Sequence, residues 1–421
     1  MNASANDVIV VGAGHAGLSI SYHLKDLHLN HLVLEKGSIG DTWHNQRWDT
    51  FKLNTPNKWN LLPGQKNMFP DSEGFCSATE FAAFLEGYSS KFQLPVIENC
   101  EVVSVECAPG SKIFSVYVSE NGTAKNYQCK QFVVASGAQN LKSIPSFFRN
   151  ISPEIVQLHT SEYRNASLLP DGAILIIGSA QSGVQIAEDL ITRDRKVFIS
   201  TSQVPRVPRR YRGKDIVDWL VLSGFYDLQT IDVTDPLILK MKQPQVSTVG
   251  LHGHTLSLQG LARNGAVILG KTENTDGADI LLQPNAVTNI RFADEFSKKI
   301  KLMIDDYIQK SQLYAPAPEE DPDDDPFESA SFASHSISLN LKENNITSII
   351  WATGFTGDFS YLKLPVFNGN GMPGHNKGIS DIEGLYFLGL PWLRKRKSGI
   401  ILGIEDDAIF IAKQILEHSG N

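Results

Sequence analysis

The sequence predicts a doubly wound α/β protein with two nested domains. Residues 7–24, DVIVVGAGHAGLSISYHL, and residues 173–190, AILIIGSAQSGVQIAEDL, each join a short apolar strand to a glycine-rich turn and an apolar helix. Such a unit belongs to a parallel sheet with helices on both faces. The length of 421 residues exceeds what one hydrophobic core usually supports, so we expect two Rossmann-like domains.

The first unit has the order of features that a dinucleotide site requires. Its strand, Val8 to Val11, is followed by the turn GAGHAG, whose glycines permit a tight turn, approach of a pyrophosphate and close packing of the helix. The helix begins near His15 and directs its N-terminal amides at the phosphates. The next strand ends at Glu35, an acid placed to bind a ribose hydroxyl, so we predict FAD here; the alternative is a purely structural turn. The predicted contacts are Gly12, Ala13, Gly14, Gly17, Glu35 and Lys36.

The second unit repeats this plan but lacks the acid. Ala180 stands where the first unit has its middle glycine, and the strand KVFIST leads into QVPRVPRRYRGKD, a run of arginines and lysine from Arg206 to Lys214. An acid would select an unmodified ribose, whereas arginine accommodates a 2′-phosphate, so we predict NADPH. The alternative is a solvated basic loop. The predicted contacts are Gly178, Ser179, Gln181, Ser182, Ser202, Arg206, Arg209 and Arg210.

Further strands and a linker are expected between and after these units. Residues 99–137 alternate like hairpin strands, with a tight turn at Asn121-Gly122 and a return to the first sheet at VVASG. The acidic, proline-rich stretch YAPAPEEDPDDDPFESAS is expected to be an exposed linker or flap. The core then resumes with ITSIIWATGF and GLYFLGL and ends in a helix from about Glu405.

This order predicts a second domain inserted into the first. We expect residues 1–167 and 336–421 to form the FAD-binding domain and residues 168–335 the NADPH-binding domain. Two such domains would bring a nicotinamide against a flavin at their interface, so both turns would serve one reaction.

Composition and charge exclude several other classes. The chain has 42% hydrophobic and 20% charged residues, as soluble globular proteins do, and its formal net charge of −8 argues against general nucleic-acid binding. No apolar run reaches the roughly 18 to 20 residues that span a bilayer, and no signal segment precedes Val8, so we expect a cytoplasmic protein that binds no membrane.

The cysteines and histidines indicate neither a redox pair nor a metal site. Disulfide reductases with two dinucleotide sites need a close pair such as C-x-x-C, and none of the four cysteines has that spacing. We expect free structural thiols. The histidines are scattered, and HGH at 252–254 has no matching pair nearby, so we expect no metal.

The motifs GAGHAG, GDTWHNQRWD, HTSEYRN, GSAQSG and WATGF together resemble those of the class B flavin monooxygenases. That family includes the flavin-containing monooxygenases, the plant auxin-forming monooxygenases and the Baeyer-Villiger monooxygenases. The resemblance extends from end to end. It is strongest to a bacterial branch labelled as flavoproteins of potassium transport, through RRYRGKD, WATGF and GLPWLRKRKSGIILGIEDDA.

The chain departs from the family at one motif. Where the fingerprint has F-x-G-x-x-x-H-x-x-x, this chain has FFRNISPEIVQLHTSEYRN, which keeps His159 and Tyr163 without the glycine or the short spacing. Tyr163-Arg164 replaces the Trp-Pro or Trp-Asp of Baeyer-Villiger enzymes. This difference favours oxygenation of a heteroatom over insertion into a ketone.

The resemblance implies that NADPH reduces FAD by hydride transfer and that O2 then gives a flavin C4a-hydroperoxide. This species would oxygenate a nitrogen, sulfur or activated carbon centre of a small molecule, while the protein supplies placement and a dry site. Asn54 would hydrogen-bond near the hydroperoxide as a catalytic residue, or else be a turn residue before Pro56. His159 would order a hinge between the domains, or else satisfy backbone groups.

Other residues are assigned to the cofactors by the same resemblance. Trp43 and Trp48 would wall the flavin or its adenosine half, with core filling as the alternative. Val102 would bind adenine through its backbone. Arg394 to Lys397 would draw an acidic substrate or form a solvated loop. The remaining predicted contacts are Gly137, Ala352, Thr353, Gly354 and Gly403.

The sequence is also compatible with two other functions. One is an NADPH oxidase or reductase without oxygen insertion. The other is a redox-sensing flavoprotein bound to a partner, for which the acidic segment 319–325 is the one candidate contact. The family habit makes a homodimer plausible.

Overall fold

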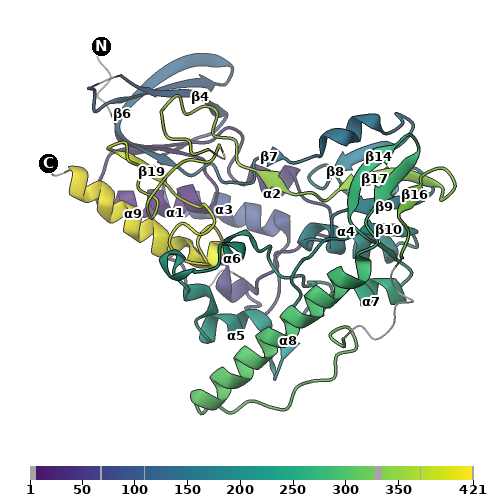
Figure 1. Cartoon of the computed structure of the whole chain (residues 1–421). Coiled ribbons are helices and arrows are strands. Elements are labelled where there is room, and N and C mark those ends of the chain that lie inside the picture. Colours follow the sequence, from purple (N-terminus) through teal and green to yellow (C-terminus); the bar gives the residue numbers. More distant parts are fainter. Residues whose placement is uncertain (1–5, 67–68, 109, 327–333, 370, 420–421) are drawn as a thin grey trace.

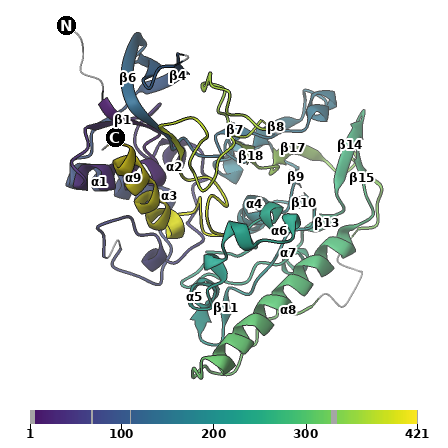
Figure 2. The ribbon, with the colours of Figure 1, turned by 60° about the vertical axis from the view of Figure 1, so that its left-hand side comes forward.

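The structure is a computed structural model that describes residues 6–66, 69–108, 110–326, 334–369 and 371–419. Two main sheets carry the two glycine turns and lie side by side, with helices packed around them (Figure 1). In Figure 2 the N-terminal and C-terminal segments gather around one sheet, and the green segments of the middle of the chain surround the other. The predicted doubly wound α/β class is confirmed.

The first sheet consists of β1 (Asn6–Val11), β2 (His31–Leu34), β3 (Val96–Ile97), β4 (Cys100–Cys107), β5 (Phe114–Glu120), β6 (Thr123–Val134) and β19 (Leu385–Phe387). Its order is β3-β2-β1-β6-β5-β4, with β19 paired to β6. β1, β2, β6 and β19 run parallel, whereas β4, β5 and β6 form the predicted antiparallel meander. The two-residue turn Asn121-Gly122 joins β5 to β6 with positive φ at both positions, as a type I′ hairpin requires.

Helices cover one face of this sheet. They are α1 (His15–Asp26), α3 (Ala78–Phe92) and α9 (Ile404–Ser419). Val8 and Val10 are fully buried against this helical layer, while Ile9 and Val11 face a second core formed with the meander and the segment before β19. The uninterrupted apolar run of β1 is thereby buried on both faces.

The second sheet is entirely parallel. Its strands are β8 (Val156–His159), β9 (Ala173–Ile177), β10 (Val197–Ser200), β13 (Val267–Leu269) and β17 (Ile346–Trp351), in the order β13-β10-β9-β17-β8. One face packs on α4 (Gln181–Ile191), α7 (Leu258–Arg263) and α8 (Ala286–Lys310). The other face packs on a small antiparallel sheet of β14 (Thr272–Asp276), β15 (Asp279–Leu282) and β16 (Ser338–Asn340).

Two strands of the second sheet come from outside the segment that contains its other strands. β8 lies before residue 168 and β17 lies after residue 335. β17 fills the position between β9 and β8, which completes the parallel sheet around the second turn. Two short strands, β7 (Leu141–Lys142) and β18 (Phe355–Thr356), pair beside this junction.

Smaller elements connect these layers. The remaining helices and strands are α2 (Asp41–Asn45), η1 (Asn57–Trp59), η2 (Ser146–Asn150), η3 (Ala166–Leu168), β11 (Arg210–Tyr211), β12 (Lys214–Asp215), α5 (Ile216–Leu222), η4 (Phe225–Asp227), η5 (Thr230–Asp232), α6 (Pro236–Lys240) and η7 (Ile401–Gly403).

The described part of the acidic stretch is mostly exposed, as predicted, but two of its carboxylates are held against the second unit. Asp324 is only 8% exposed and accepts hydrogen bonds from α8, and Asp321 accepts one from Thr255. Side-chain partners hold this part of the stretch against the second unit. Residues 327–333 of the same stretch lie outside the described residues.

Within the described residues, no helix is long and apolar enough to cross a membrane. The same residues contain no group of three or more histidine, cysteine, aspartate or glutamate side chains placed to hold a metal ion.

Candidate functional site

The first glycine turn is shaped by the close approach of neighbouring chain. Gly12 has φ +97°, and a Cβ there would lie 2.7 Å from the carbonyl oxygen of Ala135. A Cβ on Gly17 would overlap the carbonyl oxygen of Gly12, so the helix packs against the strand as predicted. Gly14 is different, because no atom of the described part of the chain lies within 4 Å of the position of its Cβ. The middle glycine therefore faces open space that an incoming group can occupy.

The second turn has the same construction. Gly178 has φ +112°, and a Cβ on it would overlap the carbonyl oxygen of Ala352. A Cβ on Gly183 would overlap the carbonyl oxygen of Gly178. The carbonyl group of Ala352 in WATGF thus approaches the second turn in the same way as that of Ala135 in VVASG approaches the first. Gly354, two residues on, has φ +84° and open space around its Cβ position, as Gly137 has beside the first turn.

Both turns leave a helix N-terminus without a side-chain cap. α1 begins after Gly14 and α4 after Ala180, and neither residue provides a hydrogen bond to the first turn of its helix. By contrast, Ser77, Asp215 and Ser257 cap α3, α5 and α7. Amide groups at an uncapped N-terminus, together with the helix dipole, favour an anion such as a pyrophosphate.

Glu35 lies directly after β2 and next to the first turn. Its carboxylate accepts hydrogen bonds from the backbone N–H of Ala13 at 2.7 Å and of Gly37 at 3.0 Å. Burial raises the pKa of Glu35, and these two backbone bonds oppose that rise. Lys36 points elsewhere, since its ammonium forms an exposed ion pair with Glu101 at 2.7 Å. Val102 is the next residue of β4 and is nearly buried.

The two tryptophans of the following loop lie in different environments. Trp43 is half-buried and meets Phe81 edge-on, with ring centroids 4.9 Å apart. Trp48 is 5% exposed and belongs to the core between the second sheet and its helices, beside Tyr163. Its position corresponds to the core-filling alternative.

Asn54 joins the first unit to the second. Its Oδ1 accepts hydrogen bonds from Gln185 at 3.0 Å and Gln181 at 3.5 Å, both on α4. Its backbone carbonyl accepts a hydrogen bond from Arg209 at 2.8 Å. Gln181 also accepts a hydrogen bond from the backbone N–H of Val246 at 3.1 Å. Asn54 therefore lies where the two units meet, as a residue between a flavin and a nicotinamide would.

Of the contacts predicted for the second unit, some lie at the glycine turn and others form ion pairs within the chain. Ser202 lies at the turn, because its N–H donates to Ser179 Oγ at 3.1 Å. Arg206 and Arg209 are each 1% exposed and form ion pairs with carboxylates of this chain. Arg210 is half-buried and donates to the carbonyl oxygen of Gly213 at 3.0 Å. The other predicted residues at this turn are Ser182 on the first turn of α4 and Thr353, which donates to the carbonyl oxygen of Ser143.

His159 ends β8 and is fully buried beside the second turn. Its Nε2 lies 2.9 Å from the carbonyl oxygen of Gly354, which can only accept, so Nε2 carries the proton. Its Nδ1 accepts from the backbone N–H of Ser161 at 3.2 Å and lies 2.9 Å from the Ser161 hydroxyl. Burial lowers the pKa of His159, the Gly354 bond opposes this, Lys142 lowers it further and Glu162 raises it. His159 is a neutral residue that satisfies backbone groups, the alternative to a hinge.

Acidification is expected to weaken this junction. Because the pKa of His159 is lowered in the folded protein, the unfolded chain binds a proton first, and stability falls as the pH drops below about 6.5. A proton on Nδ1 would also remove the acceptor of the Ser161 N–H. The free energy of unfolding, measured by urea denaturation at several pH values, should fall less steeply below pH 6.5 in His159→Gln. Equal slopes in both proteins would contradict this.

Some contact residues were not predicted. Gln185 shares a face of α4 with Gln181, four residues before it, so helical spacing was a usable signal. Gln245 is fully buried, and its amide donates to the carbonyl oxygen of Ser179 at the second turn. No local pattern marks Gln245, since it comes from a loop 66 residues further along the chain.

Three of the four cations in the basic segment before α9 form ion pairs with carboxylates of this chain. Lys395 and Lys397 each form ion pairs with Asp227 and Asp406. A Cβ on Gly403 would overlap the carbonyl oxygen of Lys397, so Gly403 permits close packing of this segment. The guanidinium of Arg396 lies instead over the rings of Phe225 and Trp392.

Comparison with known proteins gives three findings. A family model described as pyridine nucleotide-disulphide oxidoreductase matches residues 9–221, which include both glycine turns. The chain is 32% identical over 416 residues to an "Uncharacterized oxidoreductase CzcO-like" of Geobacillus kaustophilus, covering 98% of this chain and 99% of that protein. It is 24% identical over 426 residues to the "Probable indole-3-pyruvate monooxygenase YUCCA8" of Arabidopsis thaliana, covering 97% and 88%.

Solved structures share the fold at low sequence identity. A flavin-containing monooxygenase from Stenotrophomonas maltophilia is 18% identical, with a TM-score of 0.64 and coverage of 99% of this chain and 100% of that chain. The crystal structure of an OTEMO complex with FAD and NADP is 14% identical, with a TM-score of 0.59 and coverage of 100% and 87%.

Proposed function

The chain belongs to the pyridine nucleotide-disulphide oxidoreductase family, and from this premise we propose that it is a monooxygenase that holds FAD at the first glycine turn and NADPH at the second. The observation that carries the proposal is the pair of equivalent turns, each followed by a helix whose N-terminus has no side-chain cap. Each turn fits the pyrophosphate of one dinucleotide. The OTEMO structure, which shares this fold, is a complex with FAD and NADP, and this supports the same pair of cofactors here.

The thiols of the chain do not favour a disulfide reductase. All four cysteines are free, and three of them are buried. Burial raises the pKa of Cys76 and Cys129 to about 12 and of Cys100 to about 11. A thiol that exchanges with disulfides needs the opposite shift, because the thiolate is the nucleophile. Within this family, oxygen chemistry therefore fits the chain better.

The protein's contribution is binding and placement. FAD, when bound, would accept the hydride of NADPH and then activate O2, so that one oxygen atom goes to a nitrogen, sulfur or activated carbon centre and the other leaves as water. Gly14 would face the FAD pyrophosphate. Glu35, which follows β2 and lies next to the turn, would bind the ribose. Asn54, held by Gln185 of α4, is the proposed hydrogen-bonding catalytic residue at the meeting point of the two units.

Heteroatom oxygenation is the favoured outcome. Tyr163 and Arg164 stand where Baeyer-Villiger enzymes have their Trp-Pro or Trp-Asp. The Tyr163 hydroxyl is committed to Asp189 of α4 at 2.6 Å, and Arg164 donates to the carbonyl oxygen of Ser161 at 2.9 Å. We therefore propose an amine or a sulfide as the substrate.

The reaction with oxygen tests the proposal. The yellow protein is reduced anaerobically with NADPH, mixed with oxygenated buffer and followed by stopped-flow absorbance. We expect a transient band between those of reduced and oxidised flavin, and a shorter life for it in Asn54→Ala with an unchanged FAD content. Hydrogen peroxide should then rise in the variant. Direct return to oxidised flavin in the wild type, with full release of peroxide in the presence of amines and sulfides, would instead support an oxidase.

A further inference from the structure

The acidic stretch forms a strap over the basic run that follows β10. We call residues 316–326 the acidic strap. Its N-terminal end is tied to the run, since Arg212 donates to the carbonyl oxygen of Pro316 at 3.1 Å and Gly213 donates to Glu319 at 2.7 Å. Arg263 of α7 donates to the carbonyl oxygen of Pro322 at 3.0 Å. The strap is thus docked onto the second unit at several points.

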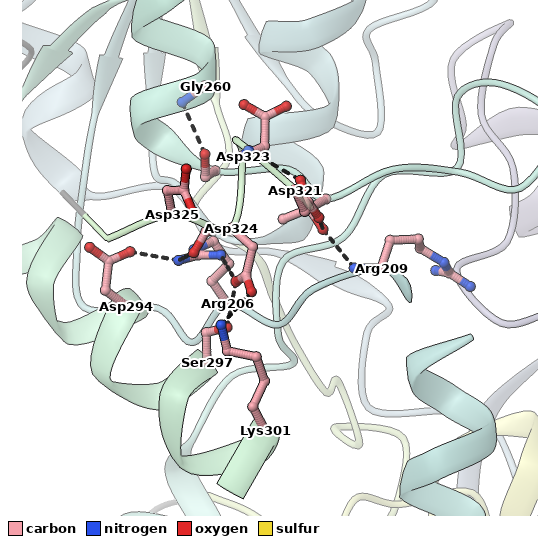
Figure 3. A network of polar contacts seen from close by, with 12 residues as sticks. Arg206, Arg209, Gly260, Asp294, Ser297, Lys301, Asp321, Asp323, Asp324 and Asp325 are labelled. Atoms are coloured by element: carbon pink, nitrogen blue, oxygen red, sulfur yellow. Dashed lines mark hydrogen bonds and ion pairs between the residues drawn. The ribbon is translucent and has the colours of Figure 1, made fainter. Parts of the chain in front are cut away.

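Arg206 lies beneath the strap, with both terminal nitrogens occupied. It is 1% exposed and is paired with Asp324 of the strap and, at 2.7 Å, with Asp294 of α8. Asp324 also accepts from Ser297 at 2.7 Å and from Lys301 at 2.6 Å. Figure 3 shows Arg206 enclosed by these side chains, while Arg209 points away from them. The cluster contains two cations, Arg206 and Lys301, and two carboxylates. It therefore carries no net positive charge that could attract a phosphate.

The other cations of the run also have partners within the chain. Arg209 is paired with Asp215 at 2.5 Å, and Arg212 with Asp305 at 2.6 Å. The ammonium of Lys214 lies over the ring of Trp219, 5.7 Å from its centroid.

Arg210 lines a cavity whose other lining residues come mainly from the acidic strap. With Lys301 it lines this cavity of about 260 Å³, into which the strap brings Glu319, Glu320, Asp321, Asp324 and Asp325. Carboxylates outnumber cations there, so the cavity repels a further negative charge. A phosphate dianion is poorly matched to this cavity.

The side chains nearest the end of β10 are neutral. Thr201 is buried and donates to the carbonyl oxygen of Leu269 at 2.7 Å, and the N–H of Ser202 is bound by Ser179. In this fold, the residues after the second strand of the unit meet the adenosine ribose. A ribose there would meet a hydroxyl group before it met any arginine.

We infer that the second turn accepts NADH as well as NADPH, because the acidic strap withholds Arg206 from a 2′-phosphate, and that Asp324 is the residue that sets this specificity. The inference rests on the proposed nicotinamide site. For a phosphate to reach Arg206, it would have to displace Asp324, which would leave a buried carboxylate without its guanidinium partner. The 2′-phosphate therefore gains little from this run in the protein as it stands.

Calorimetric titration of the FAD-loaded protein with NAD⁺ and with NADP⁺ tests this without turnover. We expect dissociation constants within about threefold of each other for the wild type. Asp324→Asn removes one charge beside Arg206, so NADP⁺ should gain about tenfold over NAD⁺, and adding Arg206→Met should abolish the gain. Asp323→Asn is the matched control, because Asp323 lies in the same strap but pairs with Arg263.

The experiment distinguishes failure of this inference from failure of the proposed function. Wild-type NADP⁺ binding that is tighter than NAD⁺ binding by about thirtyfold or more would overturn the inference while leaving the proposed function intact. Loss of such a preference in Lys271→Ala, but not in Arg206→Met, would assign the phosphate to the exposed Lys271 that follows β13. Equal effects of Asp324→Asn and Asp323→Asn would also overturn it. Binding of neither dinucleotide would contradict the proposed function itself.

Discussion

The Gly14→Ala variant is expected to fold like the wild type and to purify largely without FAD. Gly14 has φ −75° and ψ −173°, which alanine adopts without strain, and nothing lies within 4 Å of the added methyl group. The methyl would fill the space through which the FAD pyrophosphate approaches the backbone of the first turn, whereas the second turn is built with Ala180 at this place. A loss of about 100-fold in FAD affinity, or ~2.7 kcal/mol, is the expected size of the effect. The ratio of flavin absorbance to protein and the thermal midpoint measure both properties.

Gly17→Ala is the matched contrast within the same turn. Its methyl would overlap the carbonyl oxygen of Gly12, so the strand and α1 must move apart. This variant should lose both FAD and several degrees of thermal midpoint, whereas Gly14→Ala loses only FAD. A Gly14→Ala protein that stays yellow at wild-type occupancy would contradict the assignment of FAD to the first turn.

Replacing Arg209 by methionine is expected to lower the free energy of unfolding by about 3 to 5 kcal/mol. Its guanidinium forms a buried pair with Asp215, whose side chain is 4% exposed, and also donates to the carbonyl oxygen of Asn54. The variant leaves the carboxylate of Asp215 buried without its charge partner, and removes a contact that ties Asn54 to the second unit. Chemical denaturation of the FAD-loaded protein gives the free energy directly.

A second substitution separates charge from packing at this site. Asp215 also caps α5, because its Oδ1 accepts from the N–H of Val217 at 2.8 Å, and asparagine can keep that bond. The double variant Arg209→Met with Asp215→Asn should therefore recover much of the stability lost in Arg209→Met. If the double variant were as unstable as the single one, the cost would come from lost packing on Phe75, whose ring lies 4.3 Å from the guanidinium.

The glycine turns were predictable because their rules are local. Gly12 and Gly17 are fixed by contacts among a strand, a turn and the helix that follows, all within one short stretch. Glu35 was predictable for the same reason, since only α1 and β2 separate it from the turn. Uninterrupted hydrophobic runs likewise predicted β1 and β9, because both faces of these strands are buried. Alternation of apolar and polar residues predicted the meander.

The environment of Arg206 was not predictable, because its partners are distant in the sequence. Asp294 lies 88 residues and Asp324 lies 118 residues further along the chain. A run of arginines and an acidic stretch each look like solvated segments when considered alone. Their pairing arises only once α8 and the acidic strap lie against the same loop. The position of β17 within a sheet was not predictable for a related reason, since the order of strands in a parallel sheet leaves no mark on the strand itself.

Anaerobic mixing of the FAD-loaded protein with NADPH, and separately with NADH, tests most directly whether the two glycine turns serve one reaction. We expect the visible absorbance of oxidised flavin to disappear with either dinucleotide, because the second turn holds the nicotinamide against the flavin bound at the first. A protein that contains its full complement of FAD and yet stays oxidised with both would contradict the assignment of the second turn.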